Sequence, residues 1–182
     1  RRQRQMCIRD SNMTDAQNPF FEKYNTPHGT VPFDKIKAEH YEPALHEGIR
    51  RHISEINAIT DNPEAPTFAN TVLAYEKSGK LLKHVATVFN NLYSAETNDT
   101  LQALAQKLMP IFSEHNNDIS LNEKLFERIK TVYERKEQSN LTAEQTKLLE
   151  NIYDDFIRQG ANLKGEAKEE YRRLTKELSG LT

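Results

Sequence analysis

The stretch FANTVLAYEKSGKLLKHVATVFNNLY (68–93) decides the fold class, because its apolar side chains recur at the spacing of an α-helix. A first stripe steps by four and three residues through the whole stretch: Phe68, Val72, Tyr75, Gly79, Leu82, Ala86, Phe89 and Tyr93. A second stripe covers only the C-terminal half: Leu81, Val85, Val88 and Leu92. We therefore predict one amphipathic helix that is buried more deeply toward its C-terminal end.

Two residues refine this prediction. Thr67 directly precedes the first apolar residue and is a candidate N-cap, because its hydroxyl can accept a bond from a free backbone N–H group of the first turn. Gly79 lies inside the first stripe, where glycine costs about 1 kcal/mol of helix propensity relative to alanine. We expect a close crossing with another helix at this glycine.

The helical spacing continues on both sides of this stretch. Upstream, residues 40–60 carry an apolar face, with Pro43 in the first turn: Leu45, Ile49, Ile53 or His52, Ile56 and Ile59. Downstream, similar faces predict helices over about 98–119, 120–133, 142–157 and 165–178. No stretch shows the alternation of a strand. We therefore predict an all-α fold of about six amphipathic helices in an antiparallel array.

Several residues mark where these helices begin, end or bend. Pro110 lies within the pattern of the third helix and should kink or break it. Ser120 or Asn122 can start the fourth helix. Thr142 and Gln145 have the spacing of a capping box at the start of the fifth helix, and Gly160 is typical of its end.

The chain divides into three parts by composition. Residues 1–12 contain four arginines and the only cysteine, Cys7, and MCIRDS within them resembles the translation of a sequencing-library adapter. We interpret residues 1–12 as a non-native tail and expect a natural start at Met13. Residues 13–37 form an extended leader whose aromatic side chains should lie along a larger body. Residues 38–182 form the helical region, which we expect to be incomplete at its C-terminus.

Composition excludes several classes of function. The 182 residues carry a net charge of −2, which becomes −5 when the four arginines and one aspartate of residues 1–12 are left out. An acidic chain gives no indication of nucleic-acid binding. No apolar run reaches the roughly 20 residues of a membrane span. Without a targeting segment or a second cysteine, the expected location is the cytoplasm.

A zinc site is the first chemistry to test, since the chain has six histidines. His46-Glu47-Gly48-Ile49-Arg50 begins like the motif HExxH, in which two histidines one helical turn apart bind one zinc ion. Arginine stands where the second histidine is needed. His40, His46 and His52 are six apart, which turns successive side chains by about 240° on a helix. We interpret them as surface or boundary residues, and His84 and His115 as lone histidines, His115 at a boundary.

The sequence also lacks the residue patterns of nucleophilic catalysis and of phosphate binding. Nucleophilic catalysis needs a serine or cysteine beside a base, but the serines are scattered and Cys7 lies in the tail. The chain has no glycine-rich phosphate loop. Its carboxylates are spread among lysines at the spacing of solvated helix faces. We therefore predict that the chain itself contains no catalytic and no metal-binding residue; substrate-binding residues cannot be assigned from the sequence.

Several segments resemble bacterial peptidyl-dipeptidases, which belong to the thimet-oligopeptidase family of zinc metallopeptidases. The most specific segment is NPFFEKYNTPHGTVPFDKIKAEHYEPALHEGI (18–49), with Thr26-Pro-His-Gly, Pro32-Phe-Asp-Lys-Ile and His40-Tyr-Glu-Pro-Ala as signature-like pieces. The segments PTFANTVLAYEKSGKLL (66–82), NLYSAETNDTLQAL (91–104) and LTAEQTKLLENIYDDFIRQGA (141–161) continue the resemblance in order. Together they cover essentially residues 18–182.

The resemblance implies an all-α, bowl- or clam-shaped enzyme with a deep channel for short peptides. It implies hydrolysis that releases dipeptides from peptide C-termini, with zinc held by HExxH and a later glutamate. The family places those residues beyond position 182, so the resemblance assigns no zinc ligand to this chain. The chain would then be the N-terminal helical part, forming channel wall or support, with short peptides and the missing catalytic region as its partners.

Two alternatives remain open at this stage. The parent enzyme could be an endo-acting oligopeptidase of the same family, although the amino-acid sequence of residues 18–49 favours a peptidyl-dipeptidase. The chain could instead be a free-standing helical interaction module. That alternative requires a chain that folds without exposing a large apolar patch.

Overall fold

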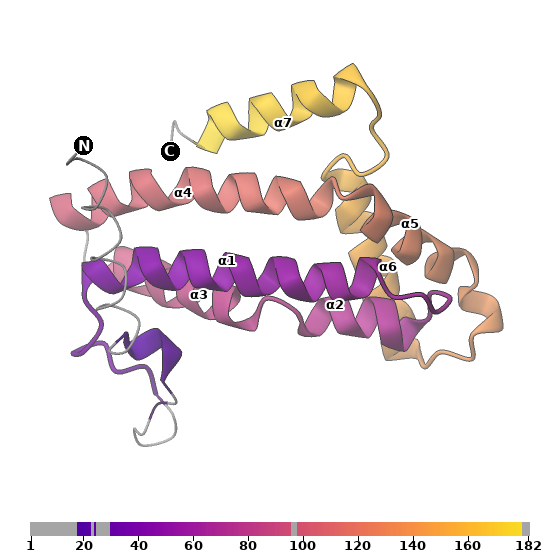
Figure 1. Ribbon diagram of the computed structural model, residues 1–182, viewed down its shortest axis with the longest axis horizontal. Coiled ribbons are helices and arrows are strands. Elements are labelled where there is room, and N and C mark those ends of the chain that lie inside the picture. Colours follow the sequence, from indigo (N-terminus) through magenta and orange to yellow (C-terminus); the bar gives the residue numbers. More distant parts are fainter. Residues whose placement is uncertain (1–17, 23, 25–29, 96–97, 180–182) are drawn as a thin grey trace, which may run out of the picture. The chain divides into compact units, whose positions relative to one another are not determined.

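The computed structural model describes residues 18–22, 24, 30–95 and 98–179, and within them every regular element is helical (Figure 1). The prediction of an all-α fold is thus confirmed. In chain order the elements are η2 (Pro19–Phe21), α1 (Ala38–Thr60), η4 (Phe68–Leu73), α2 (Ala74–Lys77), α3 (Lys80–Ala95), α4 (Asp99–Ser120), α5 (Glu123–Glu134), η5 (Lys136–Gln138), α6 (Ala143–Arg158) and α7 (Glu166–Ser179). The tail with Cys7 and the piece Thr26-Pro-His-Gly lie outside the described residues.

The stretch 68–93 is helical, but the prediction of one continuous helix is wrong. It begins with the π-helical turn η4, continues as α2, and stops at Ser78 before α3 begins at Lys80. Gly79 is the breaking point, because its backbone is left-handed with φ +66°, a conformation that glycine adopts without steric cost. A Cβ at this position would lie 3.2 Å from the His52 ring. The expected close approach therefore exists, but at a helix break.

The two prolines have less effect on their helices than expected. α4 runs unbroken from Asp99 to Ser120 with Pro110 inside it, so the predicted break is absent. α1 begins at Ala38, which places Pro43 beyond the first turn. A helix tolerates a proline where packing of the rest of its apolar face outweighs the lost backbone bond.

The predicted helix ends agree with the structure in most cases. Thr67 and Thr142 each form a reciprocal capping box, with Asn70 and Gln145 respectively. Asn122, rather than Ser120, caps α5 by accepting from the backbone N–H group of Leu125. Gly160 follows α6 with φ +82°. Local side-chain chemistry therefore sets these boundaries.

The chain separates into two compact units, which we describe one at a time. The first contains the described residues up to Arg51 together with those of Lys80–Leu104. Its centre is Tyr41, whose buried ring meets Phe20 and Phe89 edge-on at centroid distances of 5.2 and 5.3 Å. Phe20 thus attaches the described part of the leader to this unit, whereas Phe33 of the same leader is 46% exposed.

The second unit contains His52–Gly79 and the described residues from Ala105 onward. Its core consists of Ile56, Ile59, Val72, Ile119, Leu125, Phe126, Ile129, Val132, Leu149, Ile152, Phe156 and Ala161. Stacked rings extend this core, with Tyr133 on Tyr153 at 4.0 Å between centroids. Among the described residues, no helix combines the length and the apolar character that a membrane crossing requires.

Candidate functional site

A chain of hydrogen bonds links three polar side chains inside the second unit. His52 of α1 places Nδ1 2.9 Å from Nε2 of His115 on α4, and its Nε2 lies 3.1 Å from Oγ of Ser78. The Ser78 hydroxyl donates to the backbone carbonyl of Tyr75 at 2.6 Å. His115 and Ser78 are 3% and 4% exposed. We refer to His52, Ser78 and His115 as the histidine cluster.

The serine sets the direction of its hydrogen bond with His52, and the protonation of His52 then decides the direction of the bond to His115. Because Ser78 gives its only proton to a carbonyl, its Oγ accepts from His52, which therefore carries a proton on Nε2. In the neutral form His52 Nδ1 is then a bare acceptor, and it accepts from Nε2–H of His115. Burial lowers the pKa of His115, although Asp118 opposes this effect. Burial therefore favours the neutral form of the His115 imidazole.

The order serine–histidine–histidine resembles a nucleophile with its base, but the protons run the wrong way. A catalytic serine donates its proton to the histidine beside it. Ser78 donates to Tyr75 instead, and it is almost fully buried. This arrangement satisfies buried polar groups, which is the usual role of such networks.

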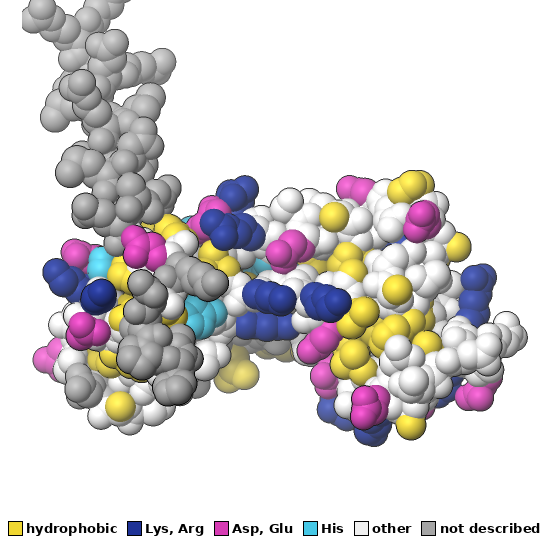
Figure 2. Space-filling view, turned by 90° about the horizontal axis from the view of Figure 1, so that it is seen from below, with side chains coloured by type: hydrophobic (Ala, Val, Ile, Leu, Met, Phe, Trp, Pro, Cys, Tyr) yellow, Lys and Arg dark blue, Asp and Glu magenta, His cyan; other side chains and the backbone are white. Residues whose placement is uncertain are grey.

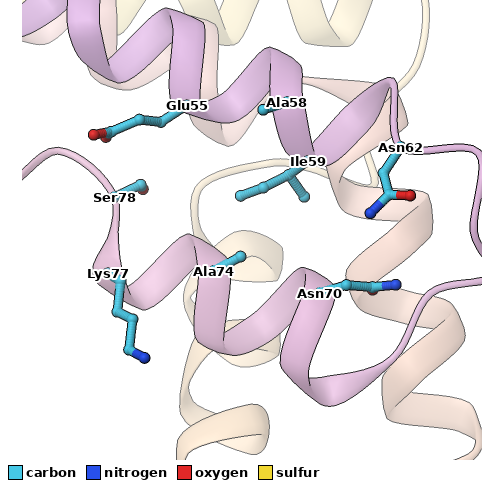
Figure 3. Close-up of a pocket in the computed structure, with 8 residues that line it drawn as sticks. All are labelled: Glu55, Ala58, Ile59, Asn62, Asn70, Ala74, Lys77 and Ser78. Atoms are coloured by element: carbon cyan, nitrogen blue, oxygen red, sulfur yellow. The ribbon is translucent and has the colours of Figure 1, made fainter.

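An open groove of about 440 Å³ lies beside the histidine cluster in the same unit (Figure 3). Its lining comes from α1, η4, α2 and the adjoining loops: Glu55, Ala58, Ile59, Asn62, Asn70, Ala74, Lys77 and Ser78. Figure 3 shows Ile59 pointing between the helices, while Lys77 extends away from them. The Glu55 carboxylate accepts from the backbone N–H group of Gly79 at 2.7 Å. The groove therefore offers an apolar floor to a small apolar group and no free acid–base pair.

One arginine holds the far end of this groove. Arg128 of α5 donates from Nη1 to the backbone carbonyls of Asn62 and Glu64, at 3.0 and 3.2 Å. The Asn70 side chain donates to the backbone carbonyl of Ala65 at 3.0 Å while its Oδ1 accepts from the backbone of Thr67. These bonds fix the connection between α1 and η4, so the groove has a defined shape.

The segment that begins like HExxH lies on the surface of the first unit. The His46 imidazole is 58% exposed and lies 3.9 Å from Glu42. Hydrogen bonds from Arg50 and Arg51 hold Glu47 in ion pairs and lower its pKa to about 2. A carboxylate held by two guanidinium groups is a poor general base. The structure thus places His46 on the surface, in agreement with its interpretation as a surface or boundary residue.

The interpretation of His115 as a lone boundary residue was wrong, because His115 is buried and hydrogen-bonded to His52. Nε2 of His84 lies 2.7 Å from the hydroxyl of Tyr24. The sequence carried a signal for the pairing of His52 with His115, since His115 lies on an apolar stripe and His52 was an alternative to Ile53. Ile53 is 43% exposed, so His52, and not Ile53, is the residue that faces inward.

Within the described part of the chain, no group of three or more His, Cys, Asp or Glu residues could hold a metal ion. The two histidines of the histidine cluster supply only two ligands.

Acidic and basic side chains are interspersed over the face shown in Figure 2, with apolar side chains exposed between them. This face is typical of the surface of charged helices.

No family model matches the chain, but curated proteins do. The chain is 40% identical over 167 residues to a dipeptidyl carboxypeptidase of Escherichia coli, an alignment that covers 92% of this chain and 24% of that protein. It is 38% identical over 166 residues to a dipeptidyl carboxypeptidase of Salmonella typhimurium, covering 91% and 24%. Oligopeptidase A of Haemophilus influenzae is 25% identical over 153 residues, covering 84% and 22%. The chain spans about a quarter of the length of these relatives.

Proposed function

Since the chain matches the N-terminal part of a thimet-oligopeptidase-family enzyme, we propose that it builds the wall or support of a peptide channel in a zinc-dependent peptidyl-dipeptidase. The single observation that carries this proposal is the 40% identity to a dipeptidyl carboxypeptidase over 92% of the chain. The substrates of the whole enzyme would be short peptides, from which it releases C-terminal dipeptides.

The pattern of identities supports an exo-acting enzyme over an endo-acting one. Identity to the two dipeptidyl carboxypeptidases is 40% and 38%. Identity falls to 25% for oligopeptidase A of Haemophilus influenzae and to 23% for an organellar oligopeptidase A of Arabidopsis thaliana. A segment that lines or supports the channel would share more of its sequence with enzymes of the same specificity.

The residues of this chain do not fit a zinc site. The full sequence contains no HExxH, because Arg50 occupies the position of the second histidine. Glu47 beside it is engaged by Arg50 and Arg51. The histidine cluster supplies two ligands and is closed by its own hydrogen bonds. We therefore assign zinc binding and peptide hydrolysis to the three quarters of such an enzyme that this chain does not match.

The purified chain tests this division of roles. We expect it to bind no stoichiometric zinc after dialysis against excess metal, measured by atomic emission. We also expect it to leave a blocked pentapeptide uncut, measured by mass spectrometry. Stoichiometric zinc together with release of a dipeptide, abolished by His46→Gln, would contradict the proposal, because the catalytic residues would then lie in this chain.

A further inference from the structure

Helix α7 uses a polar face, not its apolar one, to contact α4 and the start of α5. Asn117 of α4 donates to the Thr175 hydroxyl at 2.6 Å, and Lys176 lies 3.2 Å from Glu114. Lys168 pairs with Glu123 at 2.8 Å, and Arg172 pairs with Asp118. These contacts use four positions of α7 that share one side of the helix: residues 168, 172, 175 and 176.

The apolar stripe of α7 points elsewhere. It consists of Ala167, Tyr171, Leu174 and Leu178, which recur at four and three residues. At about 100° per residue, the centre of this stripe lies roughly a third of a turn from the polar contacts with α4. Leu174 and Leu178 are 50% and 63% exposed, the highest values for a large apolar side chain in the described part of the chain. The apolar face of α7 therefore has no cover at its C-terminal end.

Charges beside the stripe are already paired within the helix. Arg173 donates to Glu170 at 2.6 Å and to Glu177 at 2.9 Å. These residues border Leu174 and Leu178 on the side away from α4. A partner for this face thus needs no charges of its own and would be recognised through apolar side chains.

We propose that Leu174 and Leu178 are a docking surface for an apolar helix face in the three quarters of the enzyme that this chain does not match. The curated relatives are about four times as long as their match to this chain, so polypeptide of the required size is part of each of them. Apolar helix stripes in globular proteins face a core. This inference rests on the proposed function, because it takes the rest of a peptidyl-dipeptidase as the occupant.

The test compares two double variants in two proteins. The first variant, Leu174→Gln with Leu178→Gln, removes the apolar surface while glutamine keeps the helix propensity close to that of leucine. The matched control, Ile53→Gln with Met109→Gln, changes side chains that are 43% and 40% exposed on other helices. Each variant is made in the chain itself and in a fusion in which this chain replaces the matching quarter of the Escherichia coli dipeptidyl carboxypeptidase.

The proposal predicts different effects of the α7 variant in the isolated chain and in the fusion. In the isolated chain, Leu174→Gln with Leu178→Gln should leave the unfolding temperature within about 1 °C and reduce the binding of an apolar fluorescent dye. In the fusion, the same variant should lower the unfolding temperature by several degrees, whereas the control should not. Unchanged dye binding, or equal effects of both variants in the fusion, would overturn the proposal. A wild-type chain that dimerises through these leucines would also overturn it, because a second copy would then be the occupant.

Activity separates this inference from the proposed function. A fusion that fails to release dipeptides but still loses stability only with the α7 variant would contradict the proposed function and support the docking surface. A fusion that releases dipeptides and is insensitive to the α7 variant would support the function and overturn the docking surface.

Discussion

His52 Nδ1 lies 2.9 Å from His115 Nε2, although 63 positions separate the two residues in the chain. The pair joins α1 to α4 within the second unit, and Ser78 joins the loop before α3 to the same pair. Burial favours the neutral form of the His115 imidazole. Proton uptake by His115 therefore acts against the folded state.

The first prediction concerns pH. Burial lowers the pKa of His115 from the ordinary value of 6.5, so the unfolded chain takes up a proton that the folded chain resists. The stabilising contribution is complete above about pH 6.5 and is lost as the pH falls from there toward the lower folded-state pKa. We expect the free energy of unfolding, from urea titrations, to fall between about pH 7 and pH 5.

His115→Gln should reduce this fall, because the amide can still donate to His52 but takes up no proton. His46→Gln is the matched control, since it removes an imidazole that is 58% exposed. Equal pH dependence in the wild type and in His115→Gln would show that His115 does not couple to folding.

The second prediction concerns the helix break at Gly79. Gly79→Ala should destabilise the chain, because a left-handed backbone costs about 1–2 kcal/mol for alanine and the new Cβ would lie 3.2 Å from the His52 ring. Gly165→Ala is the control, since Gly165 has φ +59° and nothing within 4 Å of the added Cβ. We expect Gly79→Ala to lose roughly 1 kcal/mol more than Gly165→Ala in urea unfolding. Equal losses would mean that His52 moves aside at no cost.

The third prediction concerns Arg128. Arg128→Met removes the bonds to the carbonyls of Asn62 and Glu64, and we expect a loss of about 1–3 kcal/mol in the free energy of unfolding. Arg158→Met should change the free energy of unfolding by less than about 0.5 kcal/mol, because Arg158 pairs with exposed Asp155 on its own helix. A loss for Arg128→Met as small as that for Arg158→Met would rule out the anchoring role of this arginine.

The fourth prediction concerns Glu47. Hydrogen bonds from Arg50 and Arg51 lower its pKa to about 2. Carboxyl carbon shifts measured by NMR should therefore show a charged Glu47 throughout pH 3–5. In Arg50→Gln with Arg51→Gln the same carboxyl should titrate inside that range. Titration of the wild-type carboxyl near pH 4.5 would show that the ion pairs do not persist in solution.

The helices were largely predictable because their signals are local. Thr67, Asn122 and Thr142 cap helices through bonds that span three residues, and apolar spacing reports burial within one element. The break at Gly79 was not predicted, since the apolar stripe continues through it and a left-handed backbone leaves no signal in that spacing. The His52 ring beside Gly79 comes from another helix, which single-sequence periodicity does not place. Pro110 was expected to break α4, but propensity rules do not count the packing that holds a helix together.

The candidate site was less predictable than the fold. Single-sequence periodicity placed His115 on an apolar stripe and left His52 as an alternative to Ile53, but it could not join two residues on different helices. Their pairing depends on how α1 and α4 lie within the second unit. The family resemblance could be predicted because several family-like segments follow one another in order along the chain. The curated relatives confirm this resemblance.

Dipeptide release by the fusion of this chain with the remaining three quarters of the Escherichia coli dipeptidyl carboxypeptidase tests the proposed function most directly. We predict that the fusion releases the C-terminal dipeptide of a blocked pentapeptide, while the isolated chain does not. A folded fusion that leaves the peptide intact, or an isolated chain that cuts it, would contradict the proposal that this chain is the non-catalytic N-terminal part of a peptidyl-dipeptidase.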